Sequence, residues 1–152
     1  CPQNVGKWFW CNNNELTSLE GSPKEVEDFN CSENKLTSIK GSPDKVRGGL
    51  RCSYNYITSL EGLPKEVDTI VFDSNKITSF AGFDSYMKGS LRLWGNPIDC
   101  ITGDVKQDFI EAFQIYKVIK GDEINLKRLK YVMQTFDLPI YDSLIKKHYK
   151  IV

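Results

Sequence analysis

The sequence contains a single histidine, His148, and its 20 basic and 20 acidic residues leave no net charge. Catalysis or metal binding that needs two histidines is therefore excluded within this chain. A balanced charge produces no global field that would draw the chain to nucleic acid or to anionic lipid. No apolar run approaches the ~20 residues that span a bilayer, so we expect no membrane partner.

Chemical motifs are also missing. The five cysteines form no Cys-x-x-Cys pair, and no glycine-rich phosphate-binding loop is present. We therefore expect no metal site, no cofactor, no small-molecule substrate and no enzymatic activity. Of the 152 residues, 40% are hydrophobic and 26% are charged, a composition that is ordinary for a globular protein and argues against extended disorder.

Five asparagines recur through the first two thirds of the chain, at intervals of 20, 21, 20 and 21 residues: Asn14, Asn34, Asn55, Asn75 and Asn96. Apolar residues or cysteines stand five and three positions before each asparagine, and apolar residues stand two and five positions after it. The unit reads apolar-x-Cys/apolar-x-x-Asn-x-Leu-Thr-Ser-Leu-x-Gly-x-Pro-x-x-Val. A fixed period of this kind is the signature of a repeat architecture.

The unit has the features of a short strand followed by a tight return. Two apolar residues that are two positions apart lie on the same side of a strand. One such strand cannot bury its apolar side alone, so the units must stack into a solenoid with a shared core. The asparagine follows the strand, and stacking would align its amides into a ladder of bonds to free backbone groups. The remaining residues leave room for the Gly-x-Pro return and a short turn of helix.

The first residues fit the repeat in mid-unit. Pro2 and Val5 stand where Pro23 and Val26 stand in the next unit. We therefore expect that the chain begins within a repeat, and that preceding repeats belong to the parent protein. In that case the strand over residues 8–11 is an uncovered edge, which favours pairing or aggregation. No basic or apolar leader segment is visible at this end.

Three cysteines, Cys11, Cys31 and Cys52, share one inward-facing column. One interpretation is a metal site or disulfides, and the other is a stack of buried thiols that fill small core positions. The odd number of cysteines argues against a closed disulfide framework, and Phe72 and Leu93 continue the same column. We therefore predict buried free thiols, which favour a reducing compartment and a cytoplasmic location.

The residues between the apolar positions of each strand are expected to face the concave, exposed side of the sheet. Five strands at ~4.8 Å separation make a strip about 20 Å wide, enough for a modest protein contact. This side collects tryptophan, tyrosine and arginine, which dominate contact energies. We predict a partner-binding face of Trp8, Trp10, Asn30, Arg51, Tyr54, Val71, Asp73, Arg92 and Trp94. Alternatively, these side chains merely cover the sheet, or Trp8 and Trp10 pack against further repeats.

The repeat stops near residue 101, so we divide the chain into a solenoid over 1–101 and a C-terminal region over 102–152. Apolar residues at helical spacing predict a helix over 104–116, and Asn125 is positioned to cap a second helix that ends before Leu138 and Pro139. Residues 141–152 have a possible terminal strand. Two amphipathic helices suffice to cover the last apolar layer of a solenoid, so we expect a helical cap rather than a second functional domain.

The repeat pattern resembles the short type of leucine-rich repeat, in which proline follows the strand. The resemblance covers about residues 1–101. It implies an α+β solenoid, a leucine-rich-repeat horseshoe with a parallel sheet of about five short strands. Similar units occur in proteins of tailed bacteriophages and other large DNA viruses and in bacterial type III effectors. Some effectors add a ubiquitin-ligase domain, for which this chain has no room.

The resemblance implies a protein-recognition scaffold. We expect a non-enzymatic module that binds a protein partner through its concave sheet face; a phage relative would inhibit a host defence or regulatory protein in the bacterial cytoplasm. The alternatives are a structural part of a virion or oligomer and an effector-type recognition domain. Nucleic acid is not expected, because Asp28 and Glu33 share the face with the arginines. The basic clusters of the C-terminal third are our second choice for an acidic partner: Lys127, Arg128 and Lys130, and Lys146, Lys147 and Lys150.

Overall fold

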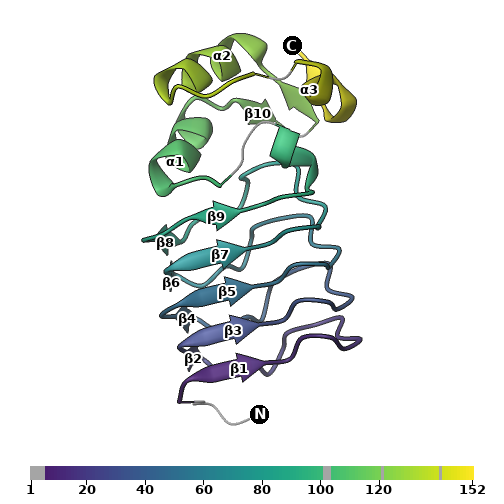
Figure 1. Cartoon of the computed structure of the whole chain (residues 1–152), viewed down its shortest axis with the longest axis vertical. Helices are drawn as coiled ribbons and strands as arrows, with labels where there is room; N and C mark the ends of the chain where they lie inside the picture. Colours follow the sequence, from purple (N-terminus) through teal and green to yellow (C-terminus); the bar gives the residue numbers. More distant parts are fainter. Residues whose placement is uncertain (1–5, 101–103, 121, 141) are drawn as a thin grey trace.

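The computed structural model describes residues 6–100, 104–120, 122–140 and 142–152. The repeat region winds into a solenoid whose strands stack in sequence order into one parallel sheet (Figure 1). Its five strands are β1 (Trp8–Trp10), β3 (Asp28–Asn30), β5 (Gly49–Arg51), β7 (Thr69–Val71) and β9 (Leu91–Arg92). The predicted solenoid with a parallel sheet is confirmed. The predictions for Pro2, Val5 and Ile101 lie outside the described residues.

A second parallel sheet runs along the same coils and was not predicted. Its four strands are β2 (Glu25–Val26), β4 (Lys45–Val46), β6 (Glu66–Val67) and β8 (Tyr86–Met87). They occupy the stretch that the sequence assigned to a return with a short turn of helix. Coils that stack in register bring any extended stretch beside its equivalent, so even two residues pair. Within the described coils, the one helical turn of this kind is η1 (Pro97–Cys100), after the fifth asparagine.

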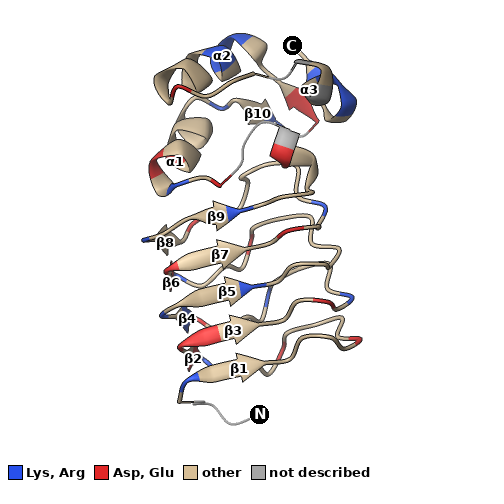
Figure 2. Ribbon diagram, in the orientation of Figure 1, with Lys and Arg blue, Asp and Glu red and all other residues tan. Residues whose placement is uncertain are grey.

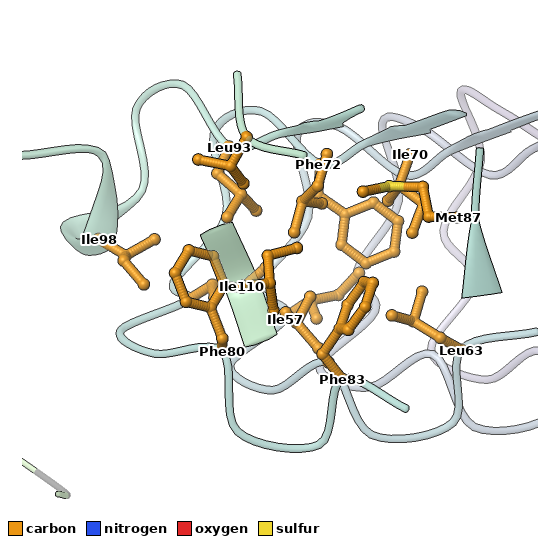
Figure 3. Close-up of a cluster of buried hydrophobic side chains, with 14 of the residues drawn as sticks. Ile57, Leu63, Ile70, Phe72, Phe80, Phe83, Met87, Leu93, Ile98 and Ile110 are labelled. Atoms are coloured by element: carbon orange, nitrogen blue, oxygen red, sulfur yellow. The ribbon is translucent and has the colours of Figure 1, made fainter. Parts of the chain in front are cut away.

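The core consists of the repeated apolar positions. Phe29, Leu50, Ile70 and Leu91, which lie five residues before an asparagine, are completely buried and face the same side of the sheet. Among the described residues, the positions two and five residues after the asparagines are buried as well from the second coil onward. Figure 3 shows how these side chains interdigitate across successive coils, and how Ile110 enters the same cluster from the C-terminal region. The strands are too short to hold together without this shared core.

The asparagines join each coil to the one before it. The Oδ1 of Asn55 accepts a hydrogen bond from the backbone N–H of Leu36 at 3.0 Å. Its Nδ2 donates to the carbonyls of Cys31 and Cys52 at 3.1 and 3.2 Å. One buried amide thus satisfies backbone groups of two coils. The same bonds recur at Asn34, Asn75 and Asn96, so the predicted ladder is confirmed.

Left-handed backbone conformations make these turns. The residue before each asparagine has a positive φ, between 54° and 72° through the five coils. The glycine seven residues after the asparagine does too, and at Gly82 a Cβ would lie only 2.6 Å from the backbone nitrogen of Glu61. A side chain there would push adjacent coils apart, which explains why glycine recurs at this position.

The prediction of free thiols is wrong for two of the three core cysteines. Cys31 and Cys52 form a disulfide, with their Cα atoms 4.9 Å apart. Stacking is the cause, because equivalent residues of adjacent coils lie at the strand spacing, within the range of about 4.4–6.8 Å that disulfides accept. An odd number of cysteines does not prevent one local pair. Cys11 keeps a free, half-buried thiol.

The C-terminal region contains three helices and a small sheet. The helices are α1 (Gln107–Ile115), α2 (Leu126–Thr135) and α3 (Asp142–His148), and the strands are β10 (Ile119–Lys120), β11 (Glu123–Ile124) and β12 (Lys150–Ile151). Both predicted helices are present, and the Oδ1 of Asn125 accepts a hydrogen bond from the N–H of Arg128 as the cap of α2. The terminal strand is present, whereas α3 was not predicted.

This region packs against the last coils of the solenoid. The ring of Phe80 meets those of Phe109 and Phe113 edge-on, at centroid distances of 6.2 and 5.4 Å. The side chain of Gln114 donates to the carbonyls of Phe80 and Phe83, and the Tyr149 hydroxyl donates to the carbonyl of Thr78. Figure 1 shows the three helices at the β9 end of the stack, opposite the end formed by β1.

The asparagine ladder predicts a difference between its interior and its end. Asn55→Ala should lower the free energy of unfolding by about 3 kcal/mol, because the backbone groups that it satisfies are buried and left unpaired. Asn14→Ala should cost less than about 1 kcal/mol, because Asn14 is exposed and its side-chain amide donates to the carbonyls of Cys11 and Asn12, within its own coil. Urea denaturation measures both values, and equal losses would contradict the ladder's role.

Candidate partner-binding face

The nine predicted residues lie together on and beside the five-stranded sheet. Strand pairing aligns Trp10 with Asn30, Asn30 with Arg51, Arg51 with Val71, and Val71 with Arg92. Trp8 lies at the start of β1. Tyr54, Asp73 and Trp94 stand two or three residues after the ends of β5, β7 and β9. We call these nine residues the sheet face. The structure thus brings together residues that are up to 86 positions apart in the chain, from Trp8 to Trp94.

Four aromatic side chains of the sheet face are largely open to solvent. Trp8, Trp10, Tyr54 and Trp94 expose 60%, 68%, 63% and 54% of their surface. Trp8 and Trp10 stack on each other, with ring centroids 6.2 Å apart, because residues two apart in a strand point to the same side. Large exposed aromatic groups on a rigid sheet carry a cost in water that a partner would remove. Asn30, Val71, Asp73 and Arg92 are half-buried among them.

Asp73, Arg92 and Trp94 form a braced group at one end of the sheet face. Arg92 makes an ion pair with Asp73, with an Nη2–Oδ2 distance of 2.6 Å, and its Nε also donates to both carboxylate oxygens. Asp73 also accepts a bond from the backbone N–H of Trp94, and the guanidinium lies 5.2 Å from the centre of the Trp94 ring. Hydrogen bonding to Asp73 raises the pKa of Arg92. These contacts hold the Arg92 guanidinium and the Trp94 ring in fixed positions.

A second ion pair lies nearer the middle. The Nη1 of Arg51 is 3.3 Å from the Oδ1 of Asp28, and the same oxygen accepts a hydrogen bond from the N–H of Gly49 at 2.8 Å. Figure 2 shows acidic and basic residues alternating along the strands rather than one sign collecting over the sheet. Each arginine of the sheet face therefore has a carboxylate beside it. This pairing disfavours phosphate as the ligand, in agreement with the sequence argument against nucleic acid.

The sequence analysis did not identify several of the exposed aromatic residues. Tyr56 follows Asn55 and is exposed, and Tyr86 is exposed on β8, in the second sheet. In the C-terminal region the rings of Tyr116 and Tyr131 meet at 5.0 Å. A hydrogen bond with Tyr131 raises the pKa of Tyr116. The repeat alignment did not mark these residues because they stand outside the strand columns or outside the repeat.

Two hollows lie away from the sheet face. One of about 530 Å³ separates the last coil from the C-terminal region and is lined in part by Phe80, Phe113, Lys117 and Lys120. Another of about 690 Å³ lies over the start of α2, beside Tyr131 and Lys127. Neither contains a residue of the sheet face. Among the described residues no group of three or more histidine, cysteine or acidic side chains is arranged to hold a metal ion.

Within the described parts of the chain, every helix is too short or too polar to cross a lipid bilayer. Comparison of the whole sequence and structure with protein-family models, curated proteins and solved structures gave no match in any of the three.

The exposure of the sheet face predicts a fluorescence signature. All three tryptophans of the chain, Trp8, Trp10 and Trp94, lie in this face and are more than half exposed. The native protein should therefore emit near the wavelength of exposed indole and be quenched readily by acrylamide, and urea should shift the emission little. A strongly blue-shifted, acrylamide-resistant native emission would contradict the described face. Free tryptophan amide serves as the reference for full exposure.

Proposed function

We propose that this protein is a non-enzymatic protein–protein interaction module that binds its partner through the sheet face. The observation that supports the proposal best is the gathering of exposed Trp8, Trp10, Tyr54 and Trp94 on one side of a parallel sheet. Tryptophan, tyrosine and arginine are the residues in which interface binding energy concentrates. The mixed charges between them supply a polar rim and favour a partner with both signs of charge.

The rigidity of the coils supports the same function. The strands that carry the sheet face are paired on both sides from β3 to β7, and buried asparagines fix the turns that follow them. Arg92 and Trp94 are already held by Asp73. A preorganised surface loses little conformational entropy on binding, so contacts of modest number suffice for useful affinity.

We further propose that the solenoid is a leucine-rich repeat of the short, proline-containing type, and that the sheet face is the concave side of its horseshoe. The period of 20 to 21 residues and the asparagine ladder support this proposal. In the same proposal residues 102–152 are a helical cap, because Phe109 and Phe113 cover the ring of Phe80 in the last coils.

The biological setting stays a prediction from the resemblance. A phage protein of this type would bind and inhibit a host defence or regulatory protein, and an effector-type domain would recognise a protein of the infected cell. The cytoplasmic location also stays a prediction. One argument for it, the free core thiols, no longer holds for Cys31 and Cys52, which are bonded to each other.

A second candidate function is assembly, and the first coil favours it. Phe9, Cys11 and Leu16 are only half-buried, whereas their equivalents one coil later are completely buried. An edge strand with a partly open apolar side is suited to pairing with another chain. Size-exclusion chromatography with light scattering distinguishes the two candidates, because a recognition module is expected to be a monomer in the absence of its partner.

Substitution of the sheet face tests the main proposal. The protein is used to capture partners from host lysate, and the dissociation constant of the purified partner is then measured by calorimetry. Trp10→Ala and Trp94→Ala should each weaken binding by about 2 kcal/mol or more, roughly thirtyfold, because they remove large exposed aromatic contacts. Circular dichroism should show an unchanged fold, because both side chains are exposed.

Tyr86→Ala is the matched control for these variants. Tyr86 exposes 60% of its surface, as the sheet-face tryptophans do, but it belongs to the second sheet. Its replacement should leave the dissociation constant unchanged. Equal binding by all three variants, or a loss with Tyr86→Ala alone, would refute binding through the sheet face.

The cap proposal predicts cooperative unfolding. Phe109→Ala should lower the free energy of unfolding by about 3–5 kcal/mol, because it removes a buried aromatic ring that packs on the last coil. A cap shares its stability with the coils that it covers, so the circular dichroism of the helices and the hydrogen exchange of the strand amides should report one transition at the same urea concentration. Separate transitions for the helices and the solenoid would show an independent domain instead.

A further inference from the structure

Three sulfur atoms occupy consecutive positions along the solenoid. Cys31 and Cys52 are joined by a disulfide, and Cys11 stands one coil before Cys31 with a free thiol. The backbone places Cys11 beside the coil of Cys31 as it places Cys31 beside the coil of Cys52. The N–H of Cys11 donates to the backbone carbonyl of Asn30, and the N–H of Cys31 donates to the backbone carbonyl of Arg51, both at 2.8 Å. Because Cys31 and Cys52 are close enough to bond, Cys11 is in position to bond Cys31 in the same way.

Accessibility differs sharply along this column. Cys31 and Cys52 are completely buried, so a thiol in solution has no direct access to their disulfide in the native fold. Cys11 belongs to the first described coil and is half-buried, so it touches both the solvent and the interior column. Among the cysteines of the described column, Cys11 is the one that is partly accessible to solvent.

We propose that Cys11 is a resolving thiol, which exchanges with the Cys31–Cys52 disulfide and gives external thiols access to it. The thiolate of Cys11 attacks the Sγ of Cys31, and a Cys11–Cys31 bond forms as the Cys31–Cys52 bond breaks. The electron pair of the broken bond leaves with the Sγ of Cys52, which takes up a proton. The number of disulfides and of thiols is unchanged, so the step needs no oxidant or reductant.

The order of the coils suits the direction of this attack. Exchange at sulfur proceeds with the incoming and leaving sulfur atoms on opposite sides of the central one. Strand order places β1 and β5 on opposite sides of β3, so the cysteines that follow these strands flank Cys31 in the same way. The product disulfide lies at the half-open end of the column. A small external thiol then attacks the sulfur of Cys11, and a second such thiol completes the reduction.

The pH dependence follows from the environment of Cys11. Burial raises the pKa of its thiol above the ordinary value, so near neutral pH the thiolate is a minor species. Only the thiolate attacks, and its concentration rises with pH until the raised pKa is passed. The exchange rate should therefore increase roughly tenfold per pH unit below that pKa.

Reduction kinetics test the proposal. Cys1 and Cys100 are replaced by serine in all proteins, so that Cys11, Cys31 and Cys52 are the only sulfhydryl-bearing residues. The loss of the Cys31–Cys52 disulfide in reduced glutathione is followed by acid quenching, alkylation and mass spectrometry. Trypsin places the three cysteines on separate peptides, 8–24, 25–35 and 52–65, so each disulfide isomer is identified directly.

Cys11→Ser should slow the reduction tenfold or more, because glutathione must then reach the buried disulfide directly. A merely structural role of Cys11 would give the opposite sign, because loosening the first coil would expose the disulfide and speed its reduction. Thr17→Ala, an exposed substitution in the same coil, is the matched control and should reduce at the parent rate. If Cys11→Ser fails to fold, alkylation of Cys11 in the native parent protein replaces it.

A crosslink between peptides 8–24 and 25–35 in the parent protein would identify the exchanged isomer. A reduction rate for Cys11→Ser within threefold of the parent's, or a faster one, would overturn the proposal, and any larger slowing supports it. Three alkylated cysteines in the air-oxidised parent would also overturn it, because no disulfide would then be available for exchange.

Discussion

The structure depends on one constraint, the in-register stacking of coils that have nearly the same backbone. No strand in the described part of the solenoid is longer than three residues, so no coil is stable without its neighbours. The asparagine amides enforce the register, because Asn34, Asn55, Asn75 and Asn96 each bond their own coil and the preceding one inside the buried core. A slip of one residue would break these bonds and turn the apolar positions outward.

Stacking also determines the outer surface. Once the inward positions are aligned, the outward positions form columns as well, and residues from distant parts of the sequence become neighbours. The pair Asp73 and Arg92 and the pair Asp28 and Arg51 both join adjacent coils in this way. The aromatic side chains of the sheet face then stand at fixed intervals on a support that does not have to order on binding. The proposed recognition surface thus follows from how the core is built.

The cysteine column follows from the same geometry, and it shows how sensitive chemistry is to register. The column accepts apolar residues of different sizes, because Cys31, Cys52, Phe72 and Leu93 are all completely buried in it. Only where two cysteines fall on adjacent coils does the strand spacing bring their sulfur atoms within bonding range. Cys11, one coil before Cys31, adds a free thiol that attacks this disulfide in the proposed exchange.

The sequence by itself determined the repeat, its period, the inward positions, the asparagine ladder and the outward residues such as Trp10 and Trp94. These features depend on side-chain type at a fixed spacing, which a sequence states directly. Only the tertiary structure decided the second sheet, the pairing of Cys31 with Cys52, and the contacts of Phe109 and Gln114 with the last coils. Backbone pairing leaves no side-chain signal in two residues such as Glu25 and Val26, and contacts between distant segments depend on distances in space that periodicity alone does not contain.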